Sequence, residues 1–194
     1  EDTKQITTAI KNVISNCILT RGIKVEKLST FDIEYLFLNI RGKSVGETVD
    51  VIITCPDDGE TKVPITIALD EIKIKTDPKH TKDIKLDDNL IMRLKYPSLA
   101  EFVKNNFDID ASNIGITESF DMITACIEQV FNEEESWAAS DCTKKELTEF
   151  LEQLSSQQFK QIETFFETMP KLSHTVKVTN PKTKKKGEVV IEGI

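Results

Sequence analysis

The sequence predicts an α+β fold, in which helices and antiparallel strands occupy separate stretches of the chain. Apolar residues recur at three- and four-residue spacing in several stretches, which is typical of amphipathic helices. Shorter stretches are β-branched and alternate in hydrophobicity, as strands do. These elements follow one another in blocks rather than as regular β–α repeats, which favours α+β. We expect a small antiparallel meander with N-terminal helices, followed by a helical segment and a C-terminal β-hairpin, in two domains over residues 1–96 and 97–194.

Two helices are expected to open the chain. The apolar residues of 3–18 form a single stripe, and Gly22 follows as a suitable stop. Ser29 or Thr30 can cap the second helix, because a side-chain oxygen accepts from the free amides of the first turn. Residues 31–41, FDIEYLFLNIR, are apolar nearly all round, so this helix needs burial on more than one side. It is either the core helix of its domain or partly faces a partner chain.

A β-hairpin is predicted over residues 47–68. Its strands read TVDVIIT and TKVPITIA, and the turn between them contains Pro-Asp-Asp-Gly at 56–59. Pro64 has no amide donor, so its strand should lie at a sheet edge or carry a bulge. The meander of four or five strands is completed by short alternating stretches at 72–75, 84–86 and 90–94.

Four helices and a second hairpin are predicted for the rest of the chain. The first two helices are expected at 99–107, capped by Ser98, and at 118–132, with a loop at 108–117 between them. The third opens at 141–143, where Thr143 and Glu146 have capping-box spacing. The fourth begins at Ser155 or Ser156 and ends before Pro170. The hairpin consists of 172–179 and 188–191 around the basic turn 180–187, NPKTKKKG.

Charge and cysteine usage narrow the functional classes. The net charge of −8 argues against nucleic acid as the main partner, because the chain would repel phosphates. Residues 171–194 nevertheless hold six lysines and two glutamates, a basic end on an acidic body.

The four cysteines form no Cys-x-x-Cys pair, and Cys17 and Cys126 lie at apolar helical positions, so buried free thiols are expected. No apolar run approaches the roughly 18 residues of a membrane span, and no signal peptide is evident. The absence of an initial Met suggests that the natural protein extends further.

No constellation of residues predicts catalysis or a cofactor. The two histidines are expected in a surface turn and in a sheet, without metal-ligand spacing. Gly42-Lys43-Ser44 resembles the end of a phosphate-binding loop, but Phe37 stands where that loop needs its first glycine. The adjacent carboxylates lie in turns, where water should screen them, so we expect no catalytic, cofactor-binding or metal-binding residue. These carboxylates are Asp57 and Asp58, Asp87 and Asp88, and Glu133–Glu135.

Residues 31–61 carry a distinctive block. FDIEYLFLNIRGKSVGE, followed by TVDVIITCPDDGETK, resembles the baseplate family of T4-type contractile-tailed phages. In that family a helix of the type F-D-x-x-Y/F-L-F-L-x-I-R-x-K-S-x-G-E precedes a hairpin opened by a C-P-x-D/C turn. IMRLKYPSLAEF at 91–102 and the terminal GEVVIEGI also fit the family. Asp58 stands where some relatives have a second cysteine, so no metal site is expected at Cys55.

The resemblance implies a structural or assembly subunit of a phage baseplate hub, acting through protein–protein contacts and not as an enzyme. Its partners would be other baseplate and tail proteins, and a homo-oligomer is compatible with this role. It would be found in the host cytoplasm during assembly and in the virion tail baseplate if retained. Two alternatives stay open: a transient assembly chaperone absent from the mature virion, and an uncharacterised enzyme that uses carboxylates.

Two segments supply the candidate interface residues. Aromatic side chains of the apolar helix 31–41 are suited to anchor a protein interface, and the basic residues at its end can pair with acidic neighbours. The lysines of the turn 180–187 have three interpretations: a solvated turn, a prong that docks on an acidic protein surface, or a nucleic-acid contact. The candidates are Phe31, Tyr35, Phe37, Arg41, Lys43, Lys182, Lys184 and Lys185.

Overall fold

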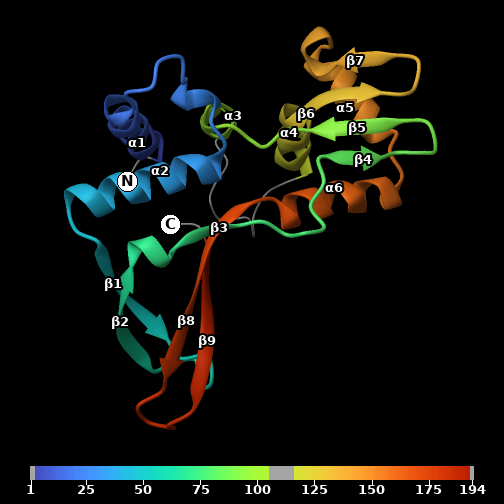
Figure 1. Ribbon diagram of the computed structural model, residues 1–194. Coiled ribbons are helices and arrows are strands. Elements are labelled where there is room, and N and C mark those ends of the chain that lie inside the picture. Colours follow the sequence, from blue (N-terminus) through green and yellow to red (C-terminus); the bar gives the residue numbers. More distant parts are fainter. Residues whose placement is uncertain (1–2, 105–115, 193–194) are drawn as a thin grey trace. The chain divides into compact units, whose positions relative to one another are not determined.

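The computed structural model describes residues 3–104 and 116–192 and confirms the α+β class (Figure 1). The described residues form two compact units, each built from segments that are distant in sequence. The first unit draws on residues 1–25, 31–75 and 170–194, and the second on 26–30 and 76–169. The expected domains over 1–96 and 97–194 stay a prediction.

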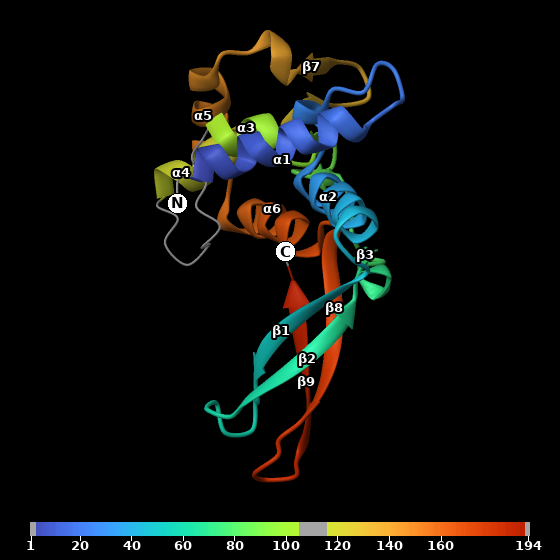
Figure 2. The same cartoon turned by 90° about the vertical axis from the view of Figure 1, so that its left-hand side faces the viewer.

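The first unit contains two helices and two antiparallel hairpins. The β1–β2 hairpin stands as a two-stranded sheet, in which Ile52 pairs with Pro64. The β8–β9 hairpin is joined by β3, so that Ile74 pairs with Leu172. Figures 1 and 2 show the two hairpins side by side from two directions. The bounds are α1 Thr3–Cys17, α2 Thr30–Ser44, β1 Thr48–Thr54, β2 Lys62–Ala68, β3 Lys73–Lys75, β8 Lys171–Thr179 and β9 Lys186–Glu192.

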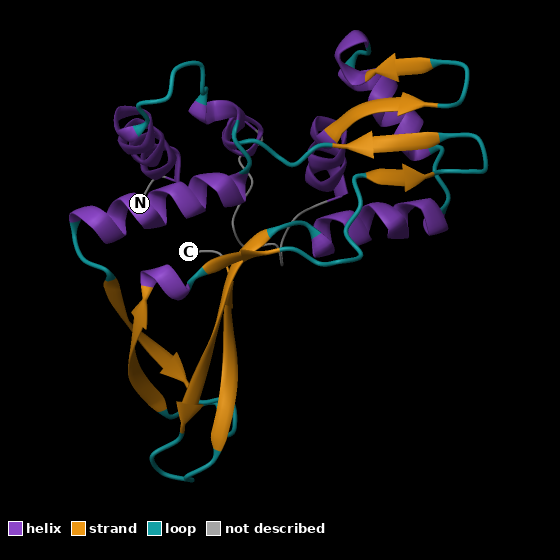
Figure 3. Ribbon diagram, in the orientation of Figure 1, coloured by secondary structure: helices purple, strands orange, loops and turns teal. Residues whose placement is uncertain are grey.

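The second unit is a four-stranded antiparallel sheet with helices, in the order β4-β5-β6-β7 (Figure 3). Its core joins residues of the sheet to residues of two helices, and these side chains are almost wholly buried. The core consists of Ile84, Leu86, Met92, Leu94, Ile127, Leu151, Ile162 and Phe165. The bounds are β4 Asp83–Lys85, β5 Ile91–Leu94, α3 Leu99–Lys104, α4 Ile116–Cys126, β6 Ile127–Phe131, β7 Ser136–Ala138, α5 Lys144–Glu152 and α6 Ser156–Thr168.

The predicted strands between 48 and 94 are present, but they do not pair as one meander. β1 and β2 pair only with each other among the described strands, β3 joins β8, and β4 and β5 join β6. Each strand is locally encoded by its alternation, whereas its partner depends on contacts across long stretches of chain. Pro64 lies at a sheet edge as predicted, since either strand of a two-stranded sheet is an edge.

The helix predicted over 118–132 is wrong from residue 127 onward. α4 ends at Cys126, and residues 127–131 form β6, which pairs with both β5 and β7. A short apolar run fits a buried strand as well as a helix, and the free edge of β5 decides between them here. The helix predicted over 99–107 is observed as α3 up to Lys104. Residues 105–107, and the predicted loop up to 115, lie outside the described residues.

The two helices at 141–170 begin where capping chemistry predicts. Thr143 accepts from the Glu146 amide, and the Glu146 carboxylate accepts from the Thr143 amide at 2.7 Å. Ser155, rather than Ser156, caps α6 in the same way with Gln158. Gln158 also donates from Nε2 to the Leu86 carbonyl at 2.6 Å, which ties the helix start to the sheet unit. The caps therefore fix both helix starts within this unit.

The cysteine prediction holds for Cys126 and fails for Cys17. All four thiols are free, and Cys126 is fully buried. Cys17 is exposed at the last position of α1. Burial raises the pKa of Cys126 to about 12, so this thiol stays protonated and packs as a small apolar group.

The capping box of α5 gives a first test of these local interactions. Thr143→Ala should lower the free energy of unfolding by about 1 kcal/mol, because the Glu146 amide loses its acceptor. Thr143→Ser keeps the hydroxyl and should stay near wild type. Chemical denaturation followed by circular dichroism measures both, and equal stability of the two variants would contradict a role for the cap.

Candidate protein-interaction surface

The predicted interface residues of α2 differ in accessibility. Phe31 is only 8% exposed and belongs to the core. Tyr35, Phe37 and Arg41 are half-buried, and Lys43 is exposed. The helix therefore covers most of its apolar surface within the protein and leaves parts of Tyr35 and Phe37 accessible.

Polar residues in the last turn of α2 and just after it stabilise the C-terminal end of the helix. The Ser44 hydroxyl donates to the Ile40 carbonyl at 2.7 Å, which satisfies one of the last carbonyls. Lys43 pairs with Glu47 at 2.8 Å, and this hydrogen bond raises the pKa of Lys43 and lowers that of Glu47. Gly46 has a φ of 153°, which glycine tolerates where the chain turns toward β1. The K-S-x-G-E part of the resemblance is thus explained by a helix end.

The turns of the two hairpins in the first unit are hydrogen-bonded to each other. Asn180 is only 1% exposed, and its Nδ2 donates to Asp57 Oδ1 and to Asp58 Oδ2, each at 2.9 Å. The Thr183 hydroxyl donates to the second oxygen of Asp57. We name these four residues, Asp57, Asp58, Asn180 and Thr183, the turn lock. The lock holds together segments more than 120 residues apart in sequence.

Each half of the turn lock is organised by its own backbone. Asp58 Oδ1 accepts from the amides of Glu60 at 3.1 Å and of Thr61 at 3.0 Å, and the Thr61 hydroxyl donates to Oδ2 at 2.5 Å. Asn180 Oδ1 accepts from the amides of Lys182 at 2.8 Å and of Thr183 at 3.3 Å. These bonds orient the side chains before the two turns meet, as Asp and Asn commonly do in tight turns.

The hydrogen bonds of the turn lock also set its charge. The Thr183 hydroxyl and then the Asn180 amide lower the pKa of Asp57. Bonds from the hydroxyl and backbone of Thr61, together with Asn180, lower the pKa of Asp58 further. Both carboxylates are therefore ionised at neutral pH, and they are committed to structure rather than only solvated as the sequence suggested.

Close packing accompanies these polar contacts. A Cβ atom on Gly187 would lie 2.7 Å from Cγ of Pro56, closer than real side chains approach. The first residue after β1, Cys55, is fully buried beneath the turn, and its amide donates to the Thr61 carbonyl at 2.7 Å. The Cys-Pro-x-Asp turn and the glycine of β9 are thus shaped to fit each other.

The lysines predicted as a prong lie in the same turn as Asn180 and Thr183 of the turn lock. Lys182, Lys184 and Lys185 are exposed, as is Lys186, and none of them has an acidic partner among the described residues. Lys184 has a φ of 62°, and its amide donates to the Asn180 carbonyl at 2.9 Å. The turn is therefore held by backbone bonds while its lysine side chains extend into solvent.

No metal centre is found in the described part of the chain. No group of three or more His, Cys, Asp or Glu residues there could hold an ion. Burial, and then the charges of Asp57 and Asp58, raise the pKa of Cys55. Cys55 is fully buried and packs as a small apolar group.

The histidines occupy ordinary structural positions. His80 is half-buried rather than a surface residue as predicted, with Nδ1 3.0 Å from the Thr168 hydroxyl and Nε2 3.1 Å from the Tyr96 hydroxyl. Burial, and then the charge of Lys82, lower its pKa. His174 lies in β8 as predicted, with Nε2 3.8 Å from a carboxylate oxygen of Glu71.

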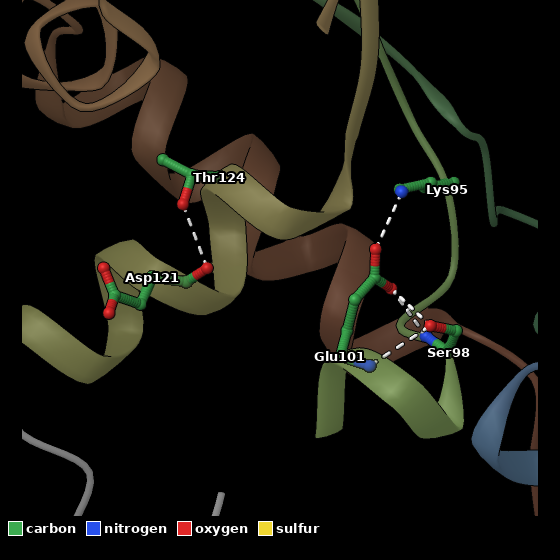
Figure 4. Close-up of polar contacts among 5 residues, drawn as sticks. All are labelled: Lys95, Ser98, Glu101, Asp121 and Thr124. Atoms are coloured by element: carbon green, nitrogen blue, oxygen red, sulfur yellow. Dashed lines mark hydrogen bonds and ion pairs between the residues drawn. The ribbon is translucent and has the colours of Figure 1, made fainter. Parts of the chain in front are cut away.

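The second unit has an open pocket of about 740 Å³, and its lining includes Glu101, Asp121 and Glu128. Figure 4 shows Glu101 and Asp121 with polar groups around them. Glu101 Oε1 accepts from Lys95 Nζ at 2.7 Å, and Oε2 accepts from the Ser98 amide and hydroxyl at 2.8 and 2.9 Å. Asp121 pairs with Lys144 at 2.7 Å. Burial raises the pKa of Glu101, but the bonds from Lys95 and Ser98 outweigh it, and the net pKa is lowered. A general acid needs a raised pKa, so this carboxylate is suited to an ion pair.

Comparison with known proteins decides the family. A family model described as T4 bacteriophage base plate protein matches residues 1–194, the whole chain. The chain belongs to the T4 bacteriophage base plate protein family. No curated protein and no solved structure matches it.

Membership gives this base plate protein a structural or assembly role in a phage baseplate and implies contacts with other phage proteins. None of the helices in its described residues has the length and apolar character needed to cross a bilayer. The tip lysines and the half-exposed aromatics of α2 are its predicted contact residues.

Sequence reasoning missed the turn lock. The sequence predicts turns at Asn180-Pro181 and at Asp57-Asp58-Gly59, and the structure has a turn at each. Their pairing leaves no local signal, because it depends on two hairpins meeting in space.

Removing the bridging amide tests the turn lock. Asn180→Ala should lower the free energy of unfolding by about 1–3 kcal/mol, because the acceptors it serves lose their donor. Thr179→Ala, at the exposed neighbouring position, should stay within about 0.5 kcal/mol of wild type. Denaturant melts of both variants measure this, and an unchanged Asn180→Ala would contradict the lock.

The turn lock should also make the free energy of unfolding depend on pH. The pKa values of Asp57 and Asp58 are lowered in the folded protein, so their contribution is present above about pH 4 and lost as the pH falls further. Wild type should therefore lose stability on acidification more steeply than the Asp57→Asn/Asp58→Asn variant. Denaturant melts between neutral and strongly acidic pH give the two slopes, and parallel slopes would contradict the assignment.

Proposed function

We propose that this base plate protein is a structural or assembly subunit of the baseplate hub, acting by binding neighbouring proteins rather than by catalysis. The observation that supports this proposal most directly is the turn lock. It holds the turns of two hairpins together, and Lys182, Lys184 and Lys185 are exposed in one of these turns. A rigid, charged projection suits docking, since little conformational freedom is lost on binding. The resemblance of residues 31–61 to hub and hub-assembly proteins supports the hub.

The partner of the prong is an acidic protein surface. The tip lysines lack acidic partners among the described residues, so a complementary surface would meet available charges. Nucleic acid is disfavoured, because the chain as a whole carries −8 and no aromatic residue is interleaved with these lysines. Self-association through the same tips is disfavoured by repulsion, so a homo-oligomer would use another surface.

The second contact surface is α2. Tyr35 and Phe37 keep part of their rings accessible, with Arg41 half-buried and Lys43 exposed farther along the helix. Phe31 supports this surface from within the core rather than touching a partner. Aromatic residues with a basic rim are typical of interface centres.

The carboxylates of the second unit support binding over catalysis. Glu101 and Asp121 are each paired with a lysine, and the net pKa of Glu101 is lowered. The protein would act in the host cytoplasm during assembly and stay in the tail baseplate as a resident component.

Two variants in an infected cell test these surfaces. Phe37→Asp and the triple variant Lys182→Glu/Lys184→Glu/Lys185→Glu should each reduce the titre of infectious phage by about tenfold or more, because a buried charge or a reversed charge opposes docking. A matched triple variant, Lys79→Glu/Lys85→Glu/Lys160→Glu, changes the same charge on exposed positions elsewhere and should assemble normally. Normal titres for both test variants would overturn the proposal.

Mass spectrometry of purified wild-type particles separates the two roles. A resident hub subunit stays with the particle, whereas a transient assembly chaperone is found in infected cells and not in particles. Its absence from particles would replace the resident role by the chaperone role.

A further inference from the structure

The second unit contains an apolar groove that the proposed function does not use. It has a volume of about 270 Å³ and an almost entirely apolar lining, and it is formed by β6, β7 and α5 together with Leu90, Ala139 and Cys142. Ile127, Val130 and Phe150 of its lining also belong to the core or pack against it, which makes the floor firm. Apolar grooves with a firm floor are suited to taking large side chains.

Trp137 forms one wall of this groove and is 45% exposed. It lies on the outer strand β7 opposite Val130. The chain has a single tryptophan, and it is placed with nearly half of its surface in water. Tryptophan side chains with this combination of rigid support and exposure are frequent centres of protein interfaces.

Acidic residues border the groove at one end. Asp87 and Asp88 line a neighbouring hollow of about 480 Å³, and Leu90 is shared by both linings. Asn132 lines the same hollow and leads directly into Glu133–Glu135, all three of which are exposed. Residues 127–152, which build most of the groove, hold eight acidic residues and two lysines.

The acids of this border are held in place and are available for a partner. Asp87 Oδ1 accepts from the amides of Asn89 and Leu90, each at 2.8 Å. Asn132 Oδ1 accepts from the amides of Glu134 at 2.8 Å and Glu135 at 2.6 Å, which fixes the β6–β7 turn. None of these carboxylates has a basic partner in the described ranges 3–104 and 116–192.

The two lysines of the segment are already engaged. Lys144 pairs with Asp121 at 2.7 Å, and Lys145 lies 3.5 Å from Glu149. They do not neutralise the acids at the β6–β7 turn. Five carboxylates without a basic partner among the described residues therefore lie at this end of the groove, beside its apolar lining.

The geometry points to this groove as a docking site for a partner-protein segment that places a bulky apolar side chain against Trp137 and a lysine or arginine beside Asp87, Asp88 and Glu133–Glu135. Charge complementarity selects this occupant: nucleic acids and anionic membranes would be repelled by the same carboxylates. The basic turn 180–187 of a second copy lacks a large apolar side chain, so it does not fit. The site does not depend on the hub assignment.

Peptide selection identifies the chemistry that the groove takes. A random library of short peptides is selected on the full chain and counter-selected on Trp137→Ala, whose fold is checked by circular dichroism. The enriched peptides should combine a bulky apolar residue with a nearby lysine or arginine. Enrichment of acidic peptides, of uncharged ones or of none would overturn the proposal.

Fluorescence then reports binding at the groove itself, because Trp137 is the only tryptophan. The most enriched peptide should shift its emission to shorter wavelength, and the same peptide with glutamate in place of its basic residues should bind at least about tenfold more weakly. Glu133→Lys/Glu134→Lys/Glu135→Lys should weaken the basic peptide similarly without touching the apolar wall. The matched variant Glu60→Lys/Glu163→Lys/Glu167→Lys, exposed elsewhere, should bind as wild type does. Equal affinity in both triple variants, or no emission shift, would overturn the site.

Discussion

The buried amide of Asn180 holds the first unit in its observed form. It donates to two carboxylates of another hairpin and accepts from two amides of its own turn, so all its hydrogen-bonding groups near the two turns have partners. A buried polar group stabilises a fold only when its hydrogen-bonding atoms have partners. Here these partners are in place only when both turns have their observed conformation. The turn lock therefore forms only when the two hairpins are correctly arranged, and it connects the two-stranded β1–β2 ribbon, which would be weak on its own, to the β3-β8-β9 sheet.

Charge is distributed to match this architecture. Asp57 and Asp58 of the turn lock accept hydrogen bonds from Asn180 and Thr183. They form no ion pair with the exposed lysines of the turn 180–187. The segment that builds most of the groove in the second unit shows the opposite balance, because Lys144 and Lys145 are ion-paired and the acids of the β6–β7 turn are not. A single acidic chain can thus present a positive projection and a negative groove, which would recognise different neighbours in an assembly.

The role of a base plate component is consistent with how the polar groups are used. The pocket carboxylates Glu101 and Asp121 are paired with lysines, Asp57 and Asp58 accept hydrogen bonds within the turn lock, and the buried thiols stay protonated. The accessible side chains that the proposals use are the half-exposed aromatic residues of α2, the lysines of the turn 180–187 and Trp137 at the apolar groove. Such features serve recognition, in which rigidity and complementarity matter more than proton transfer.

The sequence by itself determined the elements whose signals are local. The stripe of α1, the all-round apolar character of α2, both hairpins and the capping box of α5 follow from neighbours within a few residues, and each is observed. Only tertiary structure decided that 127–131 pair as β6, that β3 joins β8, that His80 is half-buried and that Asn180 meets Asp57 and Asp58. These outcomes depend on which edges and turns meet across long stretches of chain, and pairing over such distances leaves no periodic trace in one sequence.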